Sequence, residues 1–314
     1  MLREPPFRDF SPPLKLLALI AVILITFLVV LAIGVAFSIP FFGRGLLDDL
    51  AALTDYTDQR TIFALKYFQI INQLGVFVFP AILFVILTDD NFMGYLKMNH
   101  GARWFSIFFG CMVLFVSLPF IDWLVEINSN IHLPAVFHRI EDWMRHSEDE
   151  AQRLTDAFLS TTHWGGFLVN LVMIAGLAAI GEELIFRGIL VRLFREWTRN
   201  IHLAVFIPAF LFSAFHLQFY GFFGRLALGM LLGYLFVWSG SLWVPVMVHF
   251  FNNAMAVILS FAEKRGMIST DLESFGSSDN VFIIIASFIL TVGVMVMIYL
   301  HERGFFCKKK TPAA

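Results

Sequence analysis

The feature that most constrains the fold of this chain is a series of apolar runs, each roughly as long as a membrane is thick. A helix of about 20 apolar residues crosses the hydrocarbon core of a bilayer. The candidate spans are residues 16–39, 62–87, 104–123, 166–186, 203–215, 222–238, 244–261 and 281–300. We therefore expect an all-α fold, a polytopic membrane helix bundle of about eight transmembrane helices. Lys66 and Asn72 lie near the start of the second run, so its first turn is expected at the interface.

The composition also indicates an integral membrane protein surrounded by a lipid bilayer. Of the 314 residues, 59% are hydrophobic and 15% are charged, whereas a soluble domain is about 45–50% apolar. The charged residues cluster between the apolar runs, and the net charge of −2 argues against nucleic acid as a partner. We divide the chain into N-terminal membrane helices with a polar loop (1–164), a core that carries the chemistry (165–261), and a last helix with a basic tail (262–314).

The distribution of Lys and Arg predicts how the bundle is oriented. The first apolar run is longer than the roughly 7–15 residues of a signal peptide, so it is expected to remain as a helix. Positive residues favour cytoplasmic loops, and with eight spans more of them fall on the side of the N-terminus. Both termini are therefore expected in the cytoplasm. The short tail and the lack of organelle signals favour a bacterial plasma membrane.

The longest connection, residues 124–164, is predicted to be an extracytoplasmic amphipathic loop. Its apolar residues at Ile140, Met144, Leu154 and Phe158 indicate a helix at the membrane interface. The acidic residues between them are expected to face solvent.

The two cysteines are not expected to form a disulfide, because Cys111 lies in an apolar run and Cys307 lies in the tail. Cys307 precedes three lysines, a context in which S-acylation occurs, although a free thiol near the membrane is the favoured interpretation.

A pair of glutamates interrupts the fourth apolar run. Ionisable groups at membrane depth are costly and usually functional. Glu183 and Arg187 are four residues apart, so they share one helix face and are expected to form a structural ion pair. Glu182 is turned by about 100° from Glu183, which leaves its carboxylate free for another partner.

Two later apolar runs carry polar groups that a membrane should exclude. His216 ends the fifth run, and His249 and Asn253 share a face of the seventh. A carboxylate and an imidazole, here Glu182 and His216, can together position and deprotonate a water molecule. His249 and Asn253 can donate hydrogen bonds to an oxyanion. These groups suit hydrolysis of an amide within the membrane, with the catalytic site in the later half of the chain.

The ordered set Glu-Glu-x-x-x-Arg, Phe-x-x-x-His and His-x-x-x-Asn resembles the CAAX protease and bacteriocin-processing family (the CPBP or Abi family). These intramembrane endopeptidases include the type II CAAX prenyl endopeptidases. The resemblance covers about residues 165–261 and implies that Glu182 and His216 activate water while His249 and Asn253 line the oxyanion site. It further implies a membrane protein or a lipidated peptide as substrate.

The motif residues leave the cofactor open. Glu182, His216 and His249 could supply three ligands to a catalytic zinc ion, or they could act without metal as general base and oxyanion donors. We favour a glutamate-activated water and keep a divalent metal, zinc in particular, as the alternative.

Two further classes of protein stay open. Buried carboxylates and histidines also build proton relays in transporters, although the sequence contains no inverted repeat. A non-catalytic membrane scaffold or immunity factor is the other alternative. No His-Glu-x-x-His and no Gly-x-Ser-Gly pattern is present, which argues against site-2 zinc proteases and rhomboid-type serine proteases.

Overall fold

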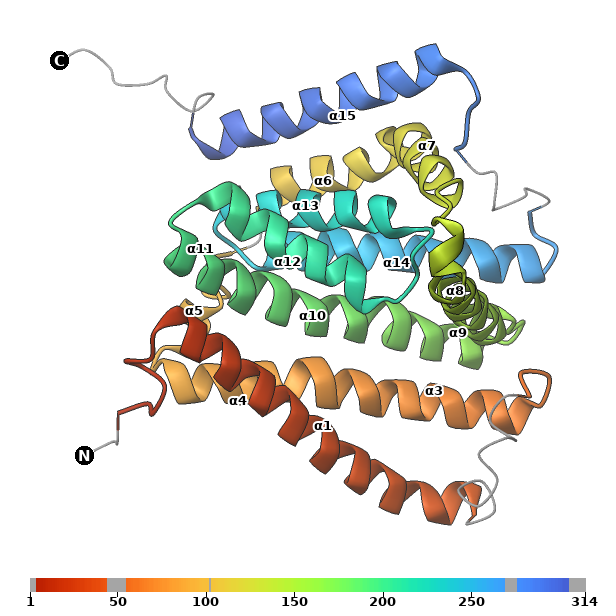
Figure 1. Ribbon diagram of the computed structural model, residues 1–314, viewed down its shortest axis with the longest axis horizontal. Coiled ribbons are helices and arrows are strands. Elements are labelled where there is room, and N and C mark those ends of the chain that lie inside the picture. The colour runs from red at the N-terminus through yellow and green to blue at the C-terminus, as the bar shows by residue number, and fades with distance from the viewer. Residues whose placement is uncertain (1–3, 44–54, 102, 269–275, 305–314) are drawn as a thin grey trace.

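The computed structural model describes residues 4–43, 55–101, 103–268 and 276–304, and within these ranges the regular structure is helical throughout. Figure 1 shows most helices running side by side. The N-terminal half contains α1 (Pro12–Phe42), α3 (Gln59–Gln73), η2 (Leu74–Val78), α4 (Phe79–Thr88), α5 (Phe92–Tyr95), α6 (Trp104–Val116), α7 (Leu118–Ser129), η3 (Ala135–Phe137) and α8 (His138–Leu159). The C-terminal half contains α9 (Trp164–Asn170), η4 (Leu171–Leu177), α10 (Ala178–Glu183), η5 (Leu184–Val191), α11 (Arg192–Thr198), α12 (Ile201–Phe215), α13 (Phe222–Ser239), α14 (Trp243–Lys264) and α15 (Val281–Glu302). Cys307, the basic tail and much of the loop before α15 lie outside the described residues.

The all-α membrane bundle is confirmed, but the count of eight spans is not. The described ranges contain six helices long and apolar enough to cross a membrane, or seven if the bent pair α6–α7 forms one span. That pair bends by 52°, at the point where Pro119 opens α7 and lacks the N–H that would continue the helix. The predicted fifth span, α12, has 15 residues and so rises only about 22 Å, short of the roughly 30 Å of a bilayer core.

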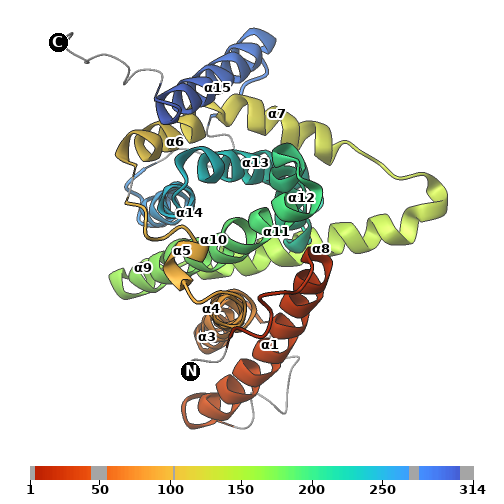
Figure 2. The same cartoon turned by 90° about the vertical axis from the view of Figure 1, so that its left-hand side faces the viewer.

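One long helix occupies the centre of the bundle. Segments α9 to α11 form a continuous helix, Trp164–Thr198. In its most apolar 18-residue stretch, 56% of the residues are buried, whereas the corresponding share is 17% in α1 and 11% in α15. Figures 1 and 2 show this helix between α3–α4 on one side and α12 and α14 on the other. The predicted span ended at Phe186, before the charge of Arg187. In the structure the helix continues, because that charge is neutralised inside the bundle.

Close helix contacts position α12 against α13. Gly229 and Gly233 on α13 face Ala209 and Val205 on α12, and a Cβ atom at Gly229 would lie 3.0 Å from the Cβ of Ala209. The absence of side chains at these glycines therefore lets the two helices approach each other.

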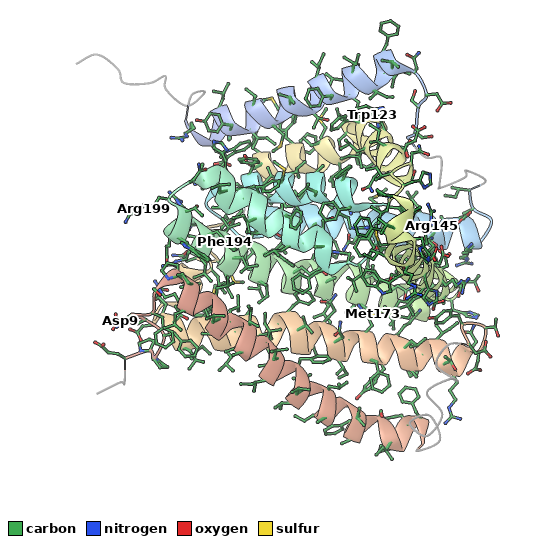
Figure 3. The ribbon with its side chains drawn as sticks, in the orientation of Figure 1. Asp9, Trp123, Arg145, Met173, Phe194 and Arg199 are labelled. Carbon is green, nitrogen blue, oxygen red and sulfur yellow. The ribbon has the colours of Figure 1, made fainter. Side chains whose placement is uncertain are left out.

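The ends of the bundle carry charge. Arg199 lies at the end where α1 begins and α15 ends, and Arg145 lies at the opposite end (Figure 3). Helix α8 crosses that second end roughly perpendicular to the spans, as both ribbon views show (Figures 1 and 2). Its Phe158 is buried, whereas Ile140 is 49% exposed. This placement agrees with a helix that lies along the membrane surface.

Candidate active site

The two glutamates lie in the short α10 segment at the middle of the central helix. Segment α10 is flanked by two π-helical segments, η4 and η5. Such wider turns are rare and are frequent at functional sites. Glu182 is only 7% exposed and Glu183 is fully buried. Both carboxylates therefore depend on protein partners rather than bulk water.

Arg187 is held by groups from three helices. Its Nη1 donates to Oε1 of Glu183 at 2.6 Å, and its Nη2 donates to the carbonyl of Gly229 on α13 at 2.9 Å. The guanidinium also lies over the ring of Phe212 on α12, 4.9 Å from its centroid. A fully buried cation with these partners fixes the central helix relative to α12 and α13.

His249 contacts the same carboxylate as Arg187. Its Nδ1 lies 2.9 Å from Oε1 of Glu183, and its Nε2 lies 3.9 Å from Oε2 of Glu182. Because a carboxylate only accepts, Nδ1 carries the proton of this hydrogen bond. Only Nε2 is then left to face the site. Helical spacing predicted the contact of Glu183 with Arg187, but it did not predict that Glu183 would also accept a hydrogen bond from His249.

His216 reaches the site from the C-terminal end of α12. Its Nδ1 lies 2.7 Å from the carbonyl of Phe212, which leaves Nε2 for other contacts. The ring stacks edge-on against Phe212, whose ring also contacts His249. Glu182 is close enough to His216 for an electrostatic interaction, although no hydrogen bond joins the two side chains in the described part of the chain. Phe212 thus contacts both imidazoles.

Asn253 is held one turn after His249 on α14. Its Nδ2 donates to the carbonyl of Ile174 at 3.0 Å, and its Oδ1 accepts from Asn252 at 3.1 Å. The acceptor carbonyl belongs to the π-helical segment η4. One N–H of the amide group is used in this way, so one remains for a ligand.

A residue outside the sequence motifs also contacts Glu182. Gln73 ends α3, is 6% exposed, and donates from Nε2 to Oε1 of Glu182 at 3.4 Å. Gln73 is an amide inside an apolar run, a signal that the sequence does carry, but the prediction named only the neighbouring Asn72 and placed it at the interface. Only the packing of η2 against α10 and of α3 against η4 shows which amide faces the site.

The zinc alternative requires Glu182, His216 and His249 to converge on one point. Within the described ranges, no group of three or more His, Cys, Asp or Glu lies close enough together to hold a metal ion. Nδ1 is engaged in both His216 and His249, so each offers one nitrogen. A catalytic zinc needs three such ligands around one point. Glu182, His216 and His249 do not fit that requirement in this arrangement, and the metal-dependent alternative stays a prediction.

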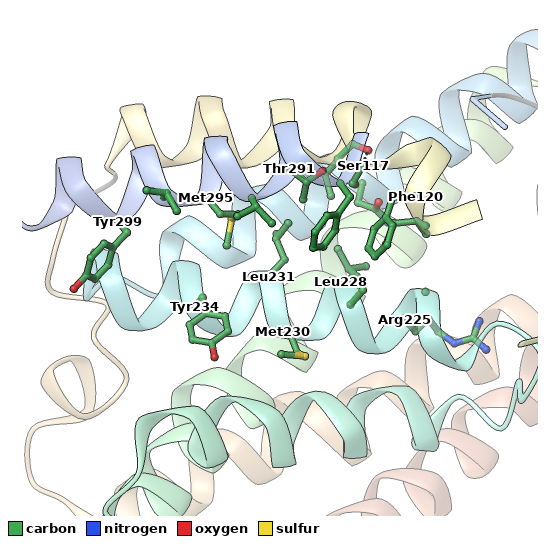
Figure 4. A pocket seen from close by; sticks show the side chains of 18 of the residues that line it. Ser117, Phe120, Arg225, Leu228, Met230, Leu231, Tyr234, Thr291, Met295 and Tyr299 are labelled. Carbon is green, nitrogen blue, oxygen red and sulfur yellow. Dashed lines mark hydrogen bonds between the residues drawn. The ribbon is translucent and has the colours of Figure 1, made fainter. Parts of the chain in front are cut away.

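A large apolar cavity reaches α14 at Asn252, although none of the motif residues lines it. It has a volume of about 1020 Å³ and is bounded by α6, α7, α13 and α15. Figure 4 shows Leu228 and Leu231 on α13 facing Phe120 and Met295 across it. Asn252 forms part of its wall and is hydrogen-bonded to Asn253. The cavity therefore borders the polar residues of α14.

Comparison with known proteins supports a protease class. Residues 164–255 match the family model described as "Type II CAAX prenyl endopeptidase Rce1-like". This segment contains every motif residue, so the family resemblance inferred from the sequence is confirmed. The chain is an integral membrane protein, and its residues 164–255 are similar to the type II CAAX prenyl endopeptidases.

One curated relative has a partial match. The uncharacterized protein YpbD of Bacillus subtilis (strain 168) is 28% identical over 90 residues, which make up 27% of this chain and 43% of that protein. The match thus spans less than half of the relative's length. No solved structure matches the chain significantly.

Proposed function

We propose that this protein is an intramembrane endopeptidase that hydrolyses a peptide bond of a membrane-associated or lipidated substrate. The observation that carries this proposal is the buried cluster of Glu182, Glu183 and His249. Helix packing could explain one buried carboxylate, Glu183, because it pairs with Arg187. It does not explain a second buried carboxylate, Glu182, at membrane depth. The family match over the same residues supports this choice of chemistry.

Charge balance assigns a role to His249. Glu182, Glu183 and Arg187 are buried and together leave one uncompensated negative charge. A His249 that carries protons on both nitrogens neutralises it. Its Nδ1–H then donates to Glu183, and its Nε2–H points toward the side of Glu182. In this form His249 can donate a hydrogen bond to an oxyanion.

The reaction follows from these positions. The carboxylate of Glu182 takes a proton from water as the water oxygen bonds to the scissile carbonyl carbon. The carbonyl oxygen becomes an oxyanion, which accepts from Nε2–H of His249 and from the remaining N–H of Asn253. The C–N bond then breaks, and the proton held by Glu182 passes to the leaving amine. His216 donates from Nδ1 to the Phe212 carbonyl, so its Nε2 is an acceptor. It is proposed to relay this proton from Glu182 to the leaving amine.

The cavity supports a substrate with a long apolar group. Its walls are mainly Leu, Phe, Met and Val side chains, and on α14 it is lined by Asn252, which donates a hydrogen bond to Asn253. An apolar chain in this space would be removed from water or replace lipid, while the peptide bond would lie near the polar end. We propose a lipidated C-terminal peptide or the membrane segment of a protein as the substrate.

The proposal is tested in proteoliposomes with the full-length protein and farnesylated and unmodified peptides, with products read by mass spectrometry. We expect Glu182→Gln and His216→Ala each to lower the turnover by about 10²–10⁴-fold, the usual contribution of a general base. Glu196→Gln and His138→Ala are matched controls, because both residues are exposed and line neither the cluster nor the cavity. Full activity of Glu182→Gln would refute the proposed base.

The same assay separates the competing mechanisms. A zinc enzyme would lose activity with a strong chelator and regain it with added zinc. A transporter would show substrate or proton flux that depends on Glu182 without any cleaved product.

A further inference from the structure

Gln73 provides a second polar group at the candidate base, from a span outside the matched segment. It is buried at the junction of α3 with the π-helical segment η2, and Nε2 donates to Oε1 of Glu182 at 3.4 Å. The reverse orientation of the amide would place two acceptor oxygens against each other, so the carboxylate fixes which atom faces it.

The carbonyl oxygen of Gln73 has no partner although it is buried. Oε1 is one of the buried side-chain atoms that lack a hydrogen bond among the described residues. Buried polar groups normally have a partner, and an exception calls for an explanation such as a bound water or a catalytic role. Here the unpartnered acceptor lies on the same side chain that holds the proposed base.

Gly181 explains how Gln73 reaches this position. A Cβ atom on Gly181 would lie 3.0 Å from the Cβ of Phe77 and 3.8 Å from Oε1 of Gln73. The missing side chain therefore lets the second span pack directly on α10, next to Glu182. The same distances place Oε1 of Gln73 at the surface of the helix that carries the base.

We propose that Oε1 of Gln73 and the carboxylate of Glu182 each accept one hydrogen of the attacking water. This inference rests on the proposed function. With both hydrogens directed toward acceptors, a lone pair of the water oxygen is left to form the bond to the scissile carbonyl carbon. One proton moves to Glu182 as that bond forms, and the other stays on the oxygen, hydrogen-bonded to Gln73. Gln73 is therefore a catalytic residue that contacts the reacting water.

The first test is Gln73→Leu, which keeps the size and removes both polar atoms. We expect kcat for peptide cleavage to fall about 100-fold with KM changed by less than about twofold, because the lost contact is made to water rather than substrate. Asn72→Leu is the matched control. It makes the same change one residue earlier, on a partly exposed side chain, and should keep wild-type kcat.

The second test is Gln73→Glu, which is isosteric with the wild-type residue. Its readout is the pH dependence of kcat, which a purely structural role of Gln73 would leave unchanged. Two adjacent carboxylates cannot readily ionise together, so Glu182 would act as a base only at higher pH. We expect the acidic limb of the kcat profile to shift upward by about one pH unit. A variant that folds and has an unchanged profile would overturn the inference, even if Gln73→Leu failed to fold.

The outcomes also separate this inference from the proposed function. Inactive Glu182→Gln with fully active Gln73→Leu would overturn the role of Gln73 and keep the protease. Full activity in both variants would overturn both. Loss of kcat in both, with Asn72→Leu unaffected and the pH profile of Gln73→Glu shifted, would support the water site.

Discussion

Nδ1 of His249 on α14 lies 2.9 Å from Oε1 of Glu183 on α10. The same oxygen accepts from Arg187 at 2.6 Å, so one buried carboxylate orients both a cation and the imidazole of the candidate site. Glu183 is thus more than a packing partner of Arg187. It fixes which nitrogen of His249 faces Glu182.

The first prediction concerns the cost of removing this carboxylate. Glu183→Leu leaves Arg187 buried without its anion, and we expect a loss of about 3–5 kcal/mol in the free energy of unfolding. Thermal unfolding in detergent measures it. The double variant Glu183→Leu/Arg187→Leu should recover much of that stability, because replacing both charges by apolar groups is often neutral.

Activity should not recover with stability in the double variant. His249 would still lack the acceptor that orients its ring, so cleavage should stay at least about tenfold below wild type. A double variant with wild-type turnover would contradict the orienting role of Glu183.

The sequence predicted the local parts of this arrangement. Glu183 and Arg187 lie four residues apart, and that spacing alone brings them together on one helix. The apolar runs likewise indicated the membrane bundle, because an uninterrupted run of about 20 apolar residues is typical of a transmembrane helix. Each of these conclusions depends on neighbours in the chain.

The sequence could not predict contacts made across the bundle. The contact between Glu183 and His249 joins residues 66 positions apart, and the contact between Gln73 and Glu182 joins residues 109 positions apart. Both depend on how helices pack, and Gly181 controls the second contact by its missing side chain. The count of eight spans was not confirmed, because the third run bends by 52° near Pro119 and the fifth run, already short in the sequence, forms a helix of only 15 residues.

The second prediction concerns the contact of α12 with α13. A side chain at Gly229 would meet Ala209, with Cβ to Cα and Cβ to carbonyl distances of 3.1 and 3.3 Å. Gly229→Val should therefore push α13 away, cost about 1–3 kcal/mol, and weaken the hydrogen bond from Arg187 to the Gly229 carbonyl. Thermal unfolding and turnover should both fall. Gly293→Val on α15 is the control, since nothing lies within 4 Å of a Cβ atom there.

The third prediction concerns pH and the segment that precedes α8. Hydrogen bonds from Arg145, His132 and the backbone N–H of Leu133 lower the pKa of Glu141 from 4.5 to about 2. A lowered pKa in the folded state contributes stability that is fully present above about pH 4.5 and is lost as the pH falls toward 2. We expect hydrogen exchange in residues 131–137 to stay slow, after correction for intrinsic rates, down to about pH 4.5 and to accelerate below it.

Glu141→Gln tests the cause of that pH dependence. The variant cannot ionise, so exchange in the same segment should already be fast at neutral pH and change little on acidification. An unchanged acid transition in Glu141→Gln would show that another group controls the segment.

The last prediction concerns the orientation of the bundle. Arg195 on α11 and Asp149 on α8 are exposed and belong to opposite ends of the molecule (Figure 1). In a background with Cys111→Ala and Cys307→Ala, Asp149→Cys should react with a membrane-impermeant maleimide in intact cells. Arg195→Cys should react only after permeabilisation, because the bias of Lys and Arg places its end in the cytoplasm. The opposite labelling pattern would invert the orientation and place the α8 end of the bundle, together with the loop after His216, on the cytoplasmic side.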